Sequence, residues 1–329
     1  MNAKKPITRL FLTTALLAGG ALQAAHAAEW PDKAIQLVVS MAPGGSNDYL
    51  ARAVAQPLGE KLGQTVVIEN RSGADGRIGT GYVARQPADG NTLGLISVTH
   101  VIHPSLFNDI PYDILADFQP VGLIAHTPFV LVVGPALGQI KTPQQFVEYA
   151  RAHPGEVTYG SSGVGSPFHL GGELIAAATG VDMLHVPFRG SGPLLPALLG
   201  GDVMAAVVPV GPFLKQIEAG NLRALGLLAD APDASLPAVP TLNQELQRDD
   251  LTMLSWLGLV APAETPRTVI QRLNEELQVV LRDPAFVSEK LSPQFYRPLP
   301  GSSDDMRNIM SKDAAMYKDI IEKAGISVN

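Results

Sequence analysis

Two glycine-rich segments carry the residues whose types and spacing could bind an anion. The first, Gly44 to Asp48, follows an apolar run and should open a helix. The second, Ser161 to Ser166, ends in an N-cap serine followed by Pro167 at the first helical position. Main-chain N–H groups at a helix N-terminus lack internal partners and lie at the positive end of the helix dipole, and glycines let an anion approach them. The candidate ligand-binding residues of the two segments are Gly44, Gly45, Ser46, Asn47, Asp48, Ser161, Ser162, Gly163, Val164, Gly165 and Ser166.

These segments could hold one carboxylate between two domains, and the alternative for each is an ordinary glycine turn. Phe168 and His169 directly follow the second segment, and His169 either contacts the ligand or packs as a neutral ring against the loop. Arg189 follows a strand-like run, where its guanidinium could bind a second carboxylate through paired hydrogen bonds. An exposed surface arginine is the alternative. Asp48 stands where a negative charge caps a helix.

Enzyme motifs are incomplete in this sequence. Gly163-Val-Gly165 is not followed by the third glycine of a dinucleotide-binding fingerprint, and no glycine loop carries a Walker A lysine. Val164 occupies the position where a nucleophile elbow needs glycine. A secreted serine hydrolase that uses Ser161 or Ser162 with His169 stays open as an alternative. The histidines lack metal-ligand spacing, so we expect neither a metal ion nor another cofactor.

The N-terminus has the layout of an export signal. Basic residues precede an apolar run from Leu10 to Leu22, and Ala25-His26-Ala27 matches a signal-peptidase site. We expect cleavage after Ala27 and a mature protein that begins at Ala28 in the periplasm. The chain has no cysteine, which excludes disulfides and a lipidated N-terminal cysteine. Its formal net charge of −7 becomes −10 once the three basic residues of the leader are removed, so nucleic acid is not an expected partner.

Strand-like and helical patterns alternate along the chain, which indicates a parallel, doubly wound α/β architecture. The proline in His126-Thr-Pro128 separates two apolar runs, and we expect the chain to leave the first domain there. The run Met253 to Ala261 should bring it back. We expect Gly63 to end the first helix and Thr142, with Pro143 after it, to begin another. The C-terminal part should hold helices from Thr265 to Leu281 and from about Ser303 to Ala324, with a short strand from Phe295 to Leu299 between them. The predicted organisation is a signal peptide at 1–27, a first domain built from 28–126 with 253–329, and a second domain at 127–252.

Short motifs along the whole mature chain resemble one family, the Bug-type periplasmic solute-binding receptors of tripartite tricarboxylate transporters. They include Pro43-Gly-Gly-Ser-Asn-Asp48, Tyr159-Gly-Ser-Ser-Gly163, His185-Val-Pro-Phe-Arg-Gly190 and Ser255-Trp-Leu-Gly-Leu. The resemblance implies a two-domain Venus-flytrap of the type II periplasmic-binding-protein class with two interdomain crossings. It also implies a ligand carboxylate held between Gly44–Asp48 and Ser161–Ser166, with ordered waters as intermediaries, and delivery of the ligand to membrane permease subunits. A monomer is expected, and a sensor in place of a permease is the alternative partner.

The resemblance and the apolar residues near the loops together predict the kind of ligand. Family members often carry an Asp-Asn pair where this chain has Val208-Pro209, so an ammonium group would find no partner there. Phe168, Phe188 and Pro209 would form an apolar wall, unless the phenylalanines only fill their own domain core. We expect an aromatic or medium-chain dicarboxylate if Arg189 points inward, an aromatic monocarboxylate as the next choice, and poor binding of amino acids.

Overall fold

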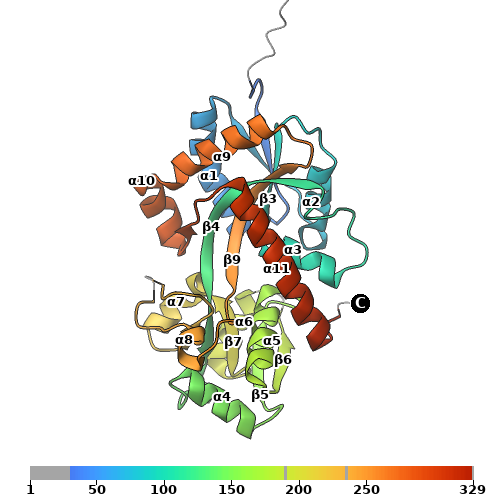
Figure 1. Ribbon diagram of the computed structural model, residues 1–329. Helices are drawn as coiled ribbons and strands as arrows, with labels where there is room; N and C mark the ends of the chain where they lie inside the picture. The colour runs from blue at the N-terminus through green and yellow to red at the C-terminus, as the bar shows by residue number, and fades with distance from the viewer. Residues whose placement is uncertain (1–29, 189–190, 234–235, 328–329) are drawn as a thin grey trace, which may run out of the picture.

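The computed structural model describes residues 30–188, 191–233 and 236–327. Two α/β lobes lie one above the other and are joined by long strands (Figure 1). The predicted signal peptide, the predicted N-terminus at Ala28 and Arg189 lie outside the described residues. No described helix combines the length and the apolar composition that crossing a membrane requires.

The first lobe is built around a parallel sheet with the strand order β2-β1-β3. Its central strand is an apolar run whose residues Ile35, Leu37 and Val39 are completely buried, as expected for a strand covered on both faces. The first helix ends where Gly63 adopts a left-handed conformation, with φ 73°, as the sequence predicts. The elements of this lobe, before the chain leaves it, are β1 (Ile35–Val39), α1 (Ser46–Leu62), β2 (Val66–Asn70), η1 (Ala74–Gly76), α2 (Arg77–Ala84), β3 (Thr92–Ser97) and α3 (Val98–Leu106).

The second lobe repeats this plan with the parallel order β6-β5-β7. Two helix starts in it are capped by the residues that the sequence indicates: Thr142 accepts a hydrogen bond from the Gln145 N–H, and Ser166 accepts one from the His169 N–H. The elements are η2 (Pro135–Leu137), α4 (Pro143–Ala152), β5 (Val157–Ser161), α5 (Pro167–Thr179), β6 (Met183–Pro187), α6 (Ser191–Gly200), β7 (Ala205–Pro209), α7 (Val210–Glu218), β8 (Arg223–Leu227) and α8 (Leu242–Leu246).

Two antiparallel strands, β4 (Phe118–Val133) and β9 (Leu254–Pro262), connect the lobes. The sequence predicts a change of sheet at His126-Thr-Pro128, between two apolar runs, and β4 is one continuous strand through this segment. What changes there is the partner, because β4 pairs with β9 as far as Pro128 and with β7 from Phe129 onward. A residue without an N–H is tolerated at the point where one ladder ends and another begins. The crossing therefore takes place inside one strand.

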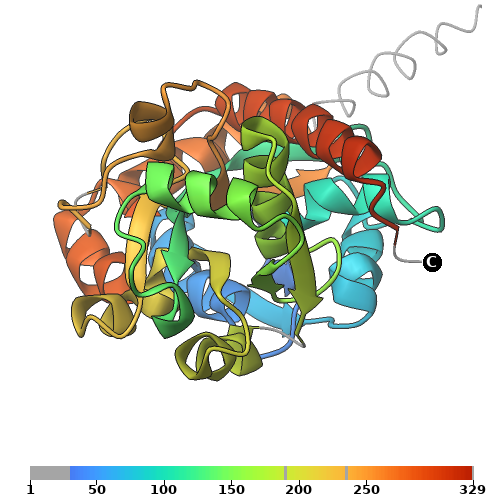
Figure 2. The same ribbon diagram turned by 90° about the horizontal axis from the view of Figure 1, so that it is seen from below.

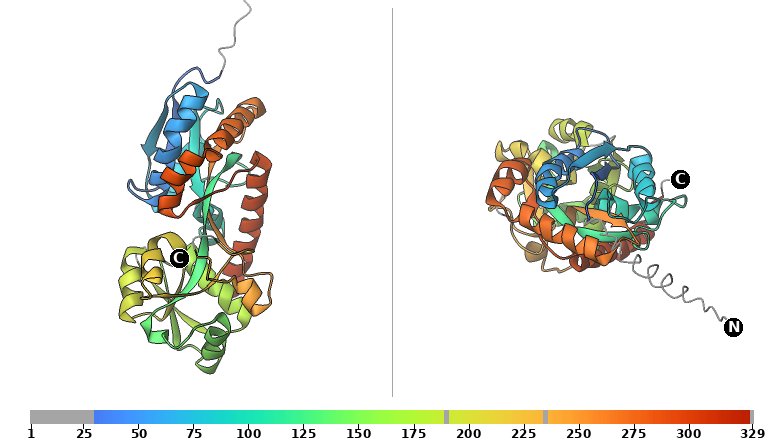
Figure 3. Two further views of the ribbon diagram at one scale, coloured as in Figure 1. Left: turned by 90° about the vertical axis from the view of Figure 1, so that its left-hand side faces the viewer. Right: turned by 90° about the horizontal axis from the view of Figure 1, so that it is seen from above.

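The C-terminal segment returns to the first lobe and ends in a long helix. That helix, α11 (Ser303–Ala324), confirms the prediction for this region and packs on α3, on β4 and on α5 of the second lobe. Figures 2 and 3 show it along one side of the molecule. The predicted strand from Phe295 to Leu299 shrinks to β10 (Arg297–Pro298), because Phe295 adopts a left-handed conformation that ends the preceding turn. The other elements here are α9 (Arg267–Leu281), α10 (Pro284–Phe286), η3 (Val287–Leu291) and η4 (Ser292–Gln294).

Candidate functional site

Both predicted loops follow the central strand of a three-stranded parallel unit. Strand β1 lies between β2 and β3, and β5 lies between β6 and β7, so the chain leaves each central strand toward one side and later returns on the other. In open α/β sheets, ligands bind outside the carboxyl end of a strand at such a switch point. The fold therefore places Gly44–Asp48 and Ser161–Ser166 at equivalent positions of the two lobes.

The loop of the first lobe presents an uncapped helix start. Gly44 has φ 83°, a conformation that favours glycine, and the N-cap residue Gly45 offers no side-chain acceptor. Within the described part of the chain, the N–H groups of Ser46 and Asn47 have no acceptor. The three residues Gly44, Gly45 and Ser46 are exposed. This helix start can therefore donate hydrogen bonds to an anion.

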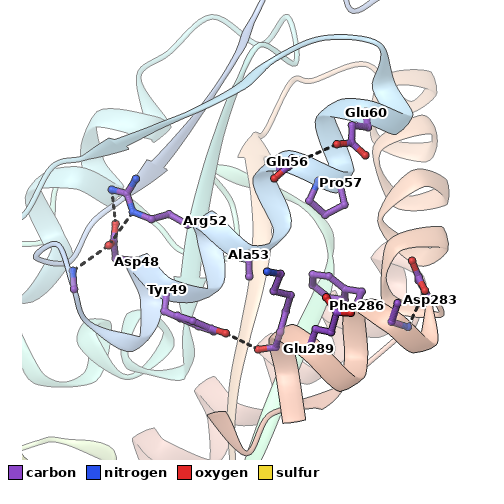
Figure 4. Close-up of a pocket in the computed structure, with 13 residues that line it drawn as sticks. Asp48, Tyr49, Arg52, Ala53, Gln56, Pro57, Glu60, Asp283, Phe286 and Glu289 are labelled. Carbon is purple, nitrogen blue, oxygen red and sulfur yellow. Dashed lines mark hydrogen bonds and ion pairs between the residues drawn. The ribbon is translucent and has the colours of Figure 1, made fainter. Parts of the chain in front are cut away.

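Asp48 supports this loop from beneath. Its buried carboxylate accepts hydrogen bonds from the Gly44 N–H at 3.0 Å, from Arg52 Nε at 3.0 Å and from Asn70 Nδ2 at 2.9 Å. Figure 4 shows Asp48 and Arg52 pointing toward each other at the start of α1. The hydrogen bond from Arg52 is the main reason why the pKa of Asp48 falls to about 2. Arg52 thus compensates a negative charge that would otherwise repel a bound carboxylate.

A surface pocket of about 700 Å³ extends from this loop along the outer face of α1 to α10 (Figure 4). Its lining mixes charges of both signs, so it does not select an anion as the helix start does. The charged residues along it are Asp48, Arg52, Glu60, Asp283, Glu289 and Lys290.

The loop of the second lobe also leaves donors free. Gly163 and Gly165 have φ 140° and 74°, which other residues rarely adopt. Their N–H groups are used inside the protein, by Ser161 Oγ at 3.1 Å and by His169 Nδ1 at 3.0 Å. The N–H groups of Ser162, Val164 and Phe168 have no acceptor among the residues that the structure describes. These groups are available to an anion in front of α5.

A cluster of polar rings lies directly under this loop. The buried hydroxyl of Ser161 lies 2.6 Å from His185 Nε2, and the rings of His169 and His185 stack with centroids 3.6 Å apart. Glu173 Oε1 lies 3.6 Å from His169 Nε2 and accepts a hydrogen bond from the hydroxyl of Tyr159. Burial raises the pKa of Glu173, but its bonds with His169 and Tyr159 outweigh that effect and keep the pKa below its usual range. The carboxylate is therefore ionised at neutral pH.

The geometry does not support the pairing on which the hydrolase alternative depends. Ser161 Oγ bonds to His185, while both ring nitrogens of His169 are directed to Gly165 and Glu173. Ser161 is also completely buried, so its hydroxyl cannot reach a substrate without movement of the loop. Ser162 is partly exposed but does not contact His169. The reason is the strand register, which sets His185 beside the end of β5.

The first lobe holds the end of its central strand in the same way. Ser40, which directly follows β1, has its hydroxyl 2.7 Å from Nε2 of the fully buried His100. His100 Nδ1 accepts the Ser97 N–H at 3.0 Å, so the ring donates its Nε2 proton to Ser40. Sequence reasoning did not assign roles to Ser40, His100, His185, Glu173 or Tyr159. The only available signal was the occurrence of polar residues at the ends of apolar strands.

The residues of the predicted apolar wall lie at the edge of the core. Phe168 is partly buried and meets Phe129 edge to face, with ring centroids 6.0 Å apart. Phe188 is also partly buried and packs against the core of the second lobe. Pro209 is partly exposed and forms the N-cap of α7. Whether these side chains contact a ligand stays a prediction. Among the described residues, no group of three side chains is arranged to hold a metal ion.

Comparison with known proteins decides the family. The model of the "Tripartite tricarboxylate transporter family receptor" matches residues 50–326. The chain belongs to this receptor family. Protein BugT of Bordetella pertussis is 35% identical over 318 residues, which cover 96% of this chain and 95% of that protein. The predicted resemblance to Bug-type receptors is confirmed.

Solved structures of related receptors share the fold. Rpa4515 of R. palustris with adipate has a TM-score of 0.76 and 33% identity, and covers 91% of this chain and 99% of its own. MatC of Rhodopseudomonas palustris with bound malate has a TM-score of 0.72 and 26% identity, with 88% and 99% covered. These likenesses confirm the predicted fold class, a two-lobed periplasmic-binding-protein fold. The tricarboxylate transporter receptor described here is therefore a periplasmic solute-binding protein by family.

Proposed function

We propose that this receptor captures a small organic carboxylate between the Gly44–Asp48 loop and the Ser161–Ser166 loop and delivers it to the permease subunits of a tripartite tricarboxylate transporter. The observation that carries the proposal is the pair of helix starts with free N–H donors at equivalent switch points of the two lobes. Each donor that bonds a carboxylate contributes a charge-assisted hydrogen bond of about 1.5 to 3 kcal/mol before ordering costs. Several such bonds would be sufficient for micromolar or tighter binding.

The ligand class follows from what surrounds the donors. The residues beyond the loops, Phe168, Phe188 and Pro209, are apolar, and they favour a ring or a methylene chain over an ammonium group. Related receptors were solved with adipate and with malate, both of which are dicarboxylates. We therefore propose an aromatic or medium-chain dicarboxylate, with an aromatic monocarboxylate as the next candidate. Arg189 is the proposed partner of the second carboxylate.

In this proposal the transport partner recognises the closed form of the receptor. We assign 28–126 with 253–329 to one domain and 127–252 to the other, so a ligand that touches both loops binds more strongly when the domains are closed. Export through cleavage after Ala27 would place the monomeric receptor in the periplasm. A sensor protein could recognise the same closed form, and this remains the alternative to a permease.

A thermal-shift screen of the mature protein tests the proposal. We expect adipate, aromatic dicarboxylates or aromatic monocarboxylates to raise the melting temperature, and small-angle scattering to show a smaller radius of gyration with the same acid. Glutamate and aspartate should have little effect. If only amino acids or citrate stabilise the protein, the proposed ligand class is wrong. Ester or amide hydrolysis that disappears in Ser161→Ala would favour the hydrolase instead.

We call the two proposed binding loops, Gly44–Asp48 and Ser161–Ser166, the first and the second anchor loop. A variant of the second anchor loop links the screen to the proposed site. Gly163→Val should abolish stabilisation by the acid, because valine cannot adopt φ 140° without strain and the loop would have to change its conformation. Gly155→Val is the matched control, since Gly155 also has a left-handed conformation, with φ 73°, but lies before β5. Full binding in Gly163→Val would remove this loop from the proposed site.

A further inference from the structure

Two stacked histidines connect the second anchor loop to the lobe beneath it. His169 comes from the first turn of α5 and His185 from β6, and their ring planes lie within 10° of parallel. Each ring bonds to a different part of the loop. His169 holds the N–H of Gly165, and His185 holds the hydroxyl of Ser161. These bonds fix the two glycine turns whose neighbours present the free N–H donors.

The bond to Gly165 defines the protonation state of His169. A main-chain N–H can only donate, so His169 Nδ1 must accept and cannot carry a proton. The proton of the neutral ring therefore lies on Nε2, on the side of Glu173. If Nδ1 takes up a proton, two N–H groups face each other and the Gly165 bond is lost. The loop geometry thus requires a neutral His169.

The bond to Ser161 works through the hydroxyl. Ser161 Oγ lies 3.1 Å from the Gly163 N–H and 3.0 Å from the Gly163 carbonyl oxygen. All three contacts are satisfied when His185 Nε2–H and the Gly163 N–H donate to Oγ and the hydroxyl donates to the Gly163 carbonyl. Burial, and secondarily the neighbouring His169, lower the pKa of His185 to about 4. With centroids 3.6 Å apart, two charged rings would repel each other.

We propose that His169 and His185 are positioning residues for the bound carboxylate, and that one proton taken up by His169 releases the Ser161–Ser166 loop and weakens ligand binding. The proposal rests on the proposed function, because it treats this loop as the carboxylate site. The proton goes to Nδ1 of His169, and Gly165 loses its acceptor. Binding would then be strongest at neutral pH and weaker in an acidified periplasm.

Several charged and titratable groups lie around the pair. Glu173 on α5 lies 3.6 Å from His169 Nε2 and is ionised, because its bonds with His169 and Tyr159 keep its pKa below the usual range. Tyr159 on β5 is neutral because burial and the bond to Glu173 raise its pKa. Other charged side chains near the outer side of α5 are paired among themselves: Arg248 with Asp250 at 2.6 Å and Lys323 of α11 with Asp319 at 2.8 Å. On α3, which reaches the loop at Leu106, burial lowers the pKa of His103 to about 4.

A ligand-free experiment tests the loop. In protein labelled with [15N]glycine, the Gly165 amide resonance should move as the solution is acidified from about pH 8 to about pH 5, the range in which histidines titrate. His169→Asn places a carbonyl oxygen at the Nδ1 position, so it keeps the acceptor and cannot titrate. Its Gly165 resonance should therefore stay in place. A Gly165 resonance that moves equally in the wild type and in His169→Asn, or that moves in neither, would overturn the proposal.

A second measurement uses adipate as the probe. In the wild type, affinity should fall about tenfold over the same pH range, which corresponds to one lost hydrogen bond. His169→Asn should bind with little pH dependence, and His169→Leu, which lacks an acceptor, should bind weakly throughout. His153→Asn, the same exchange at the C-terminus of α4, should behave as the wild type. If adipate does not bind at all, the proposed ligand class fails while the amide experiment still decides the role of His169.

Discussion

Asp48 shows how a negative side chain can support a loop that is proposed to bind an anion. Three donors converge on its carboxylate, one from the loop itself and two from the side chains of Arg52 and Asn70. The charge is neutralised locally, and among the described residues the N–H groups of Ser46 and Asn47 at the helix start have no acceptor. In the second lobe, His169 holds the loop in place of a carboxylate, because its Nδ1 accepts the Gly165 N–H. Both loops therefore leave main-chain N–H donors free, but different side chains support them.

We predict that Asp48→Asn destabilises the free protein. The amide has one oxygen acceptor, so it cannot satisfy Gly44, Arg52 and Asn70 together, and a loss of about 1 to 3 kcal/mol is expected. Because the pKa of Asp48 is lowered to about 2, its contribution is complete above the ordinary value of 3.8 and is lost only as the pH falls toward 2. Urea unfolding at neutral pH measures the difference.

The control for this variant is Asp304→Asn, which makes the same exchange at an exposed position in the first turn of α11. Its stability should stay close to that of the wild type. Equal losses in both variants would mean that Asp48 acts only as a general helix-start charge.

At the scale of elements, α11 and β9 meet at a buried hydrogen bond. Trp256 on the crossing strand donates its indole N–H to Asp313 Oδ2 at 2.6 Å, and Trp256 is completely buried. Burial raises the pKa of Asp313 to about 6 despite the bond from Trp256. Since α11 also packs on α5 of the second lobe, this bond lies in the region that the proposed closure of the lobes would have to adjust.

We predict that Asp313→Asn stabilises the protein above about pH 6. The raised pKa means that an ionised Asp313 disfavours folding, so its favourable contribution is present at low pH and lost as the pH rises through about 6. The neutral amide keeps an acceptor for Trp256 and should gain about 1 to 3 kcal/mol at neutral pH. The gain should shrink as the pH falls from about 6 and should be absent below the ordinary value of 3.8.

Tryptophan fluorescence in a Trp30→Phe background isolates Trp256 and reports the titration directly. The emission should change near pH 6 in the parent and stay constant in Asp313→Asn. Asp319→Asn, an exposed exchange on the same helix, should leave the titration in place. A parent emission that does not change with pH would contradict the buried, titrating carboxylate.

At the scale of the whole molecule, buried histidines govern the response to acid. Burial is the main cause that lowers the pKa of His100 to about 3 and the pKa values of His103 and His185 to about 4. An unfolded chain binds protons at these residues below the ordinary value of 6.5, while the folded chain does not. Stability is therefore lost as the pH falls from about 6.5 to about 4. The raised pKa of Asp313 changes the free energy of unfolding in the opposite direction, but Asp313 is a single group.

We predict that the free energy of unfolding decreases steadily over that pH range. Urea titrations at several pH values should give a slope that is smaller in His100→Gln, because glutamine does not titrate in the unfolded chain and can still donate from the Nε2 position to Ser40. The same slope in the variant and the wild type would show that His100 is not responsible.

The sequence alone determined the local features of this protein. The glycine loops, the caps at Thr142 and Ser166, the Gly63 stop and the bounds of α11 follow from backbone conformation and nearest-neighbour hydrogen bonds. Helix α3 was not predicted, because Pro104 and its β-branched residues are unfavourable and its stability comes from packing on α11. The family and the fold class followed from motifs spread along the whole chain.

Tertiary structure decided how the two loops are supported. Ser161 finds His185 instead of His169 because parallel pairing sets β6 beside β5, and register fixes which side chains meet. Asp48 reaches Asn70 because β2 lies next to β1, a neighbour that spacing along the chain does not reveal. Likewise, β4 stays continuous through Pro128 because two different strands pair with its two halves. The glycines and cap residues in the sequence determine the backbone conformation of the anchor loops. Pairing between strands that are distant in sequence determines which side chains support these loops.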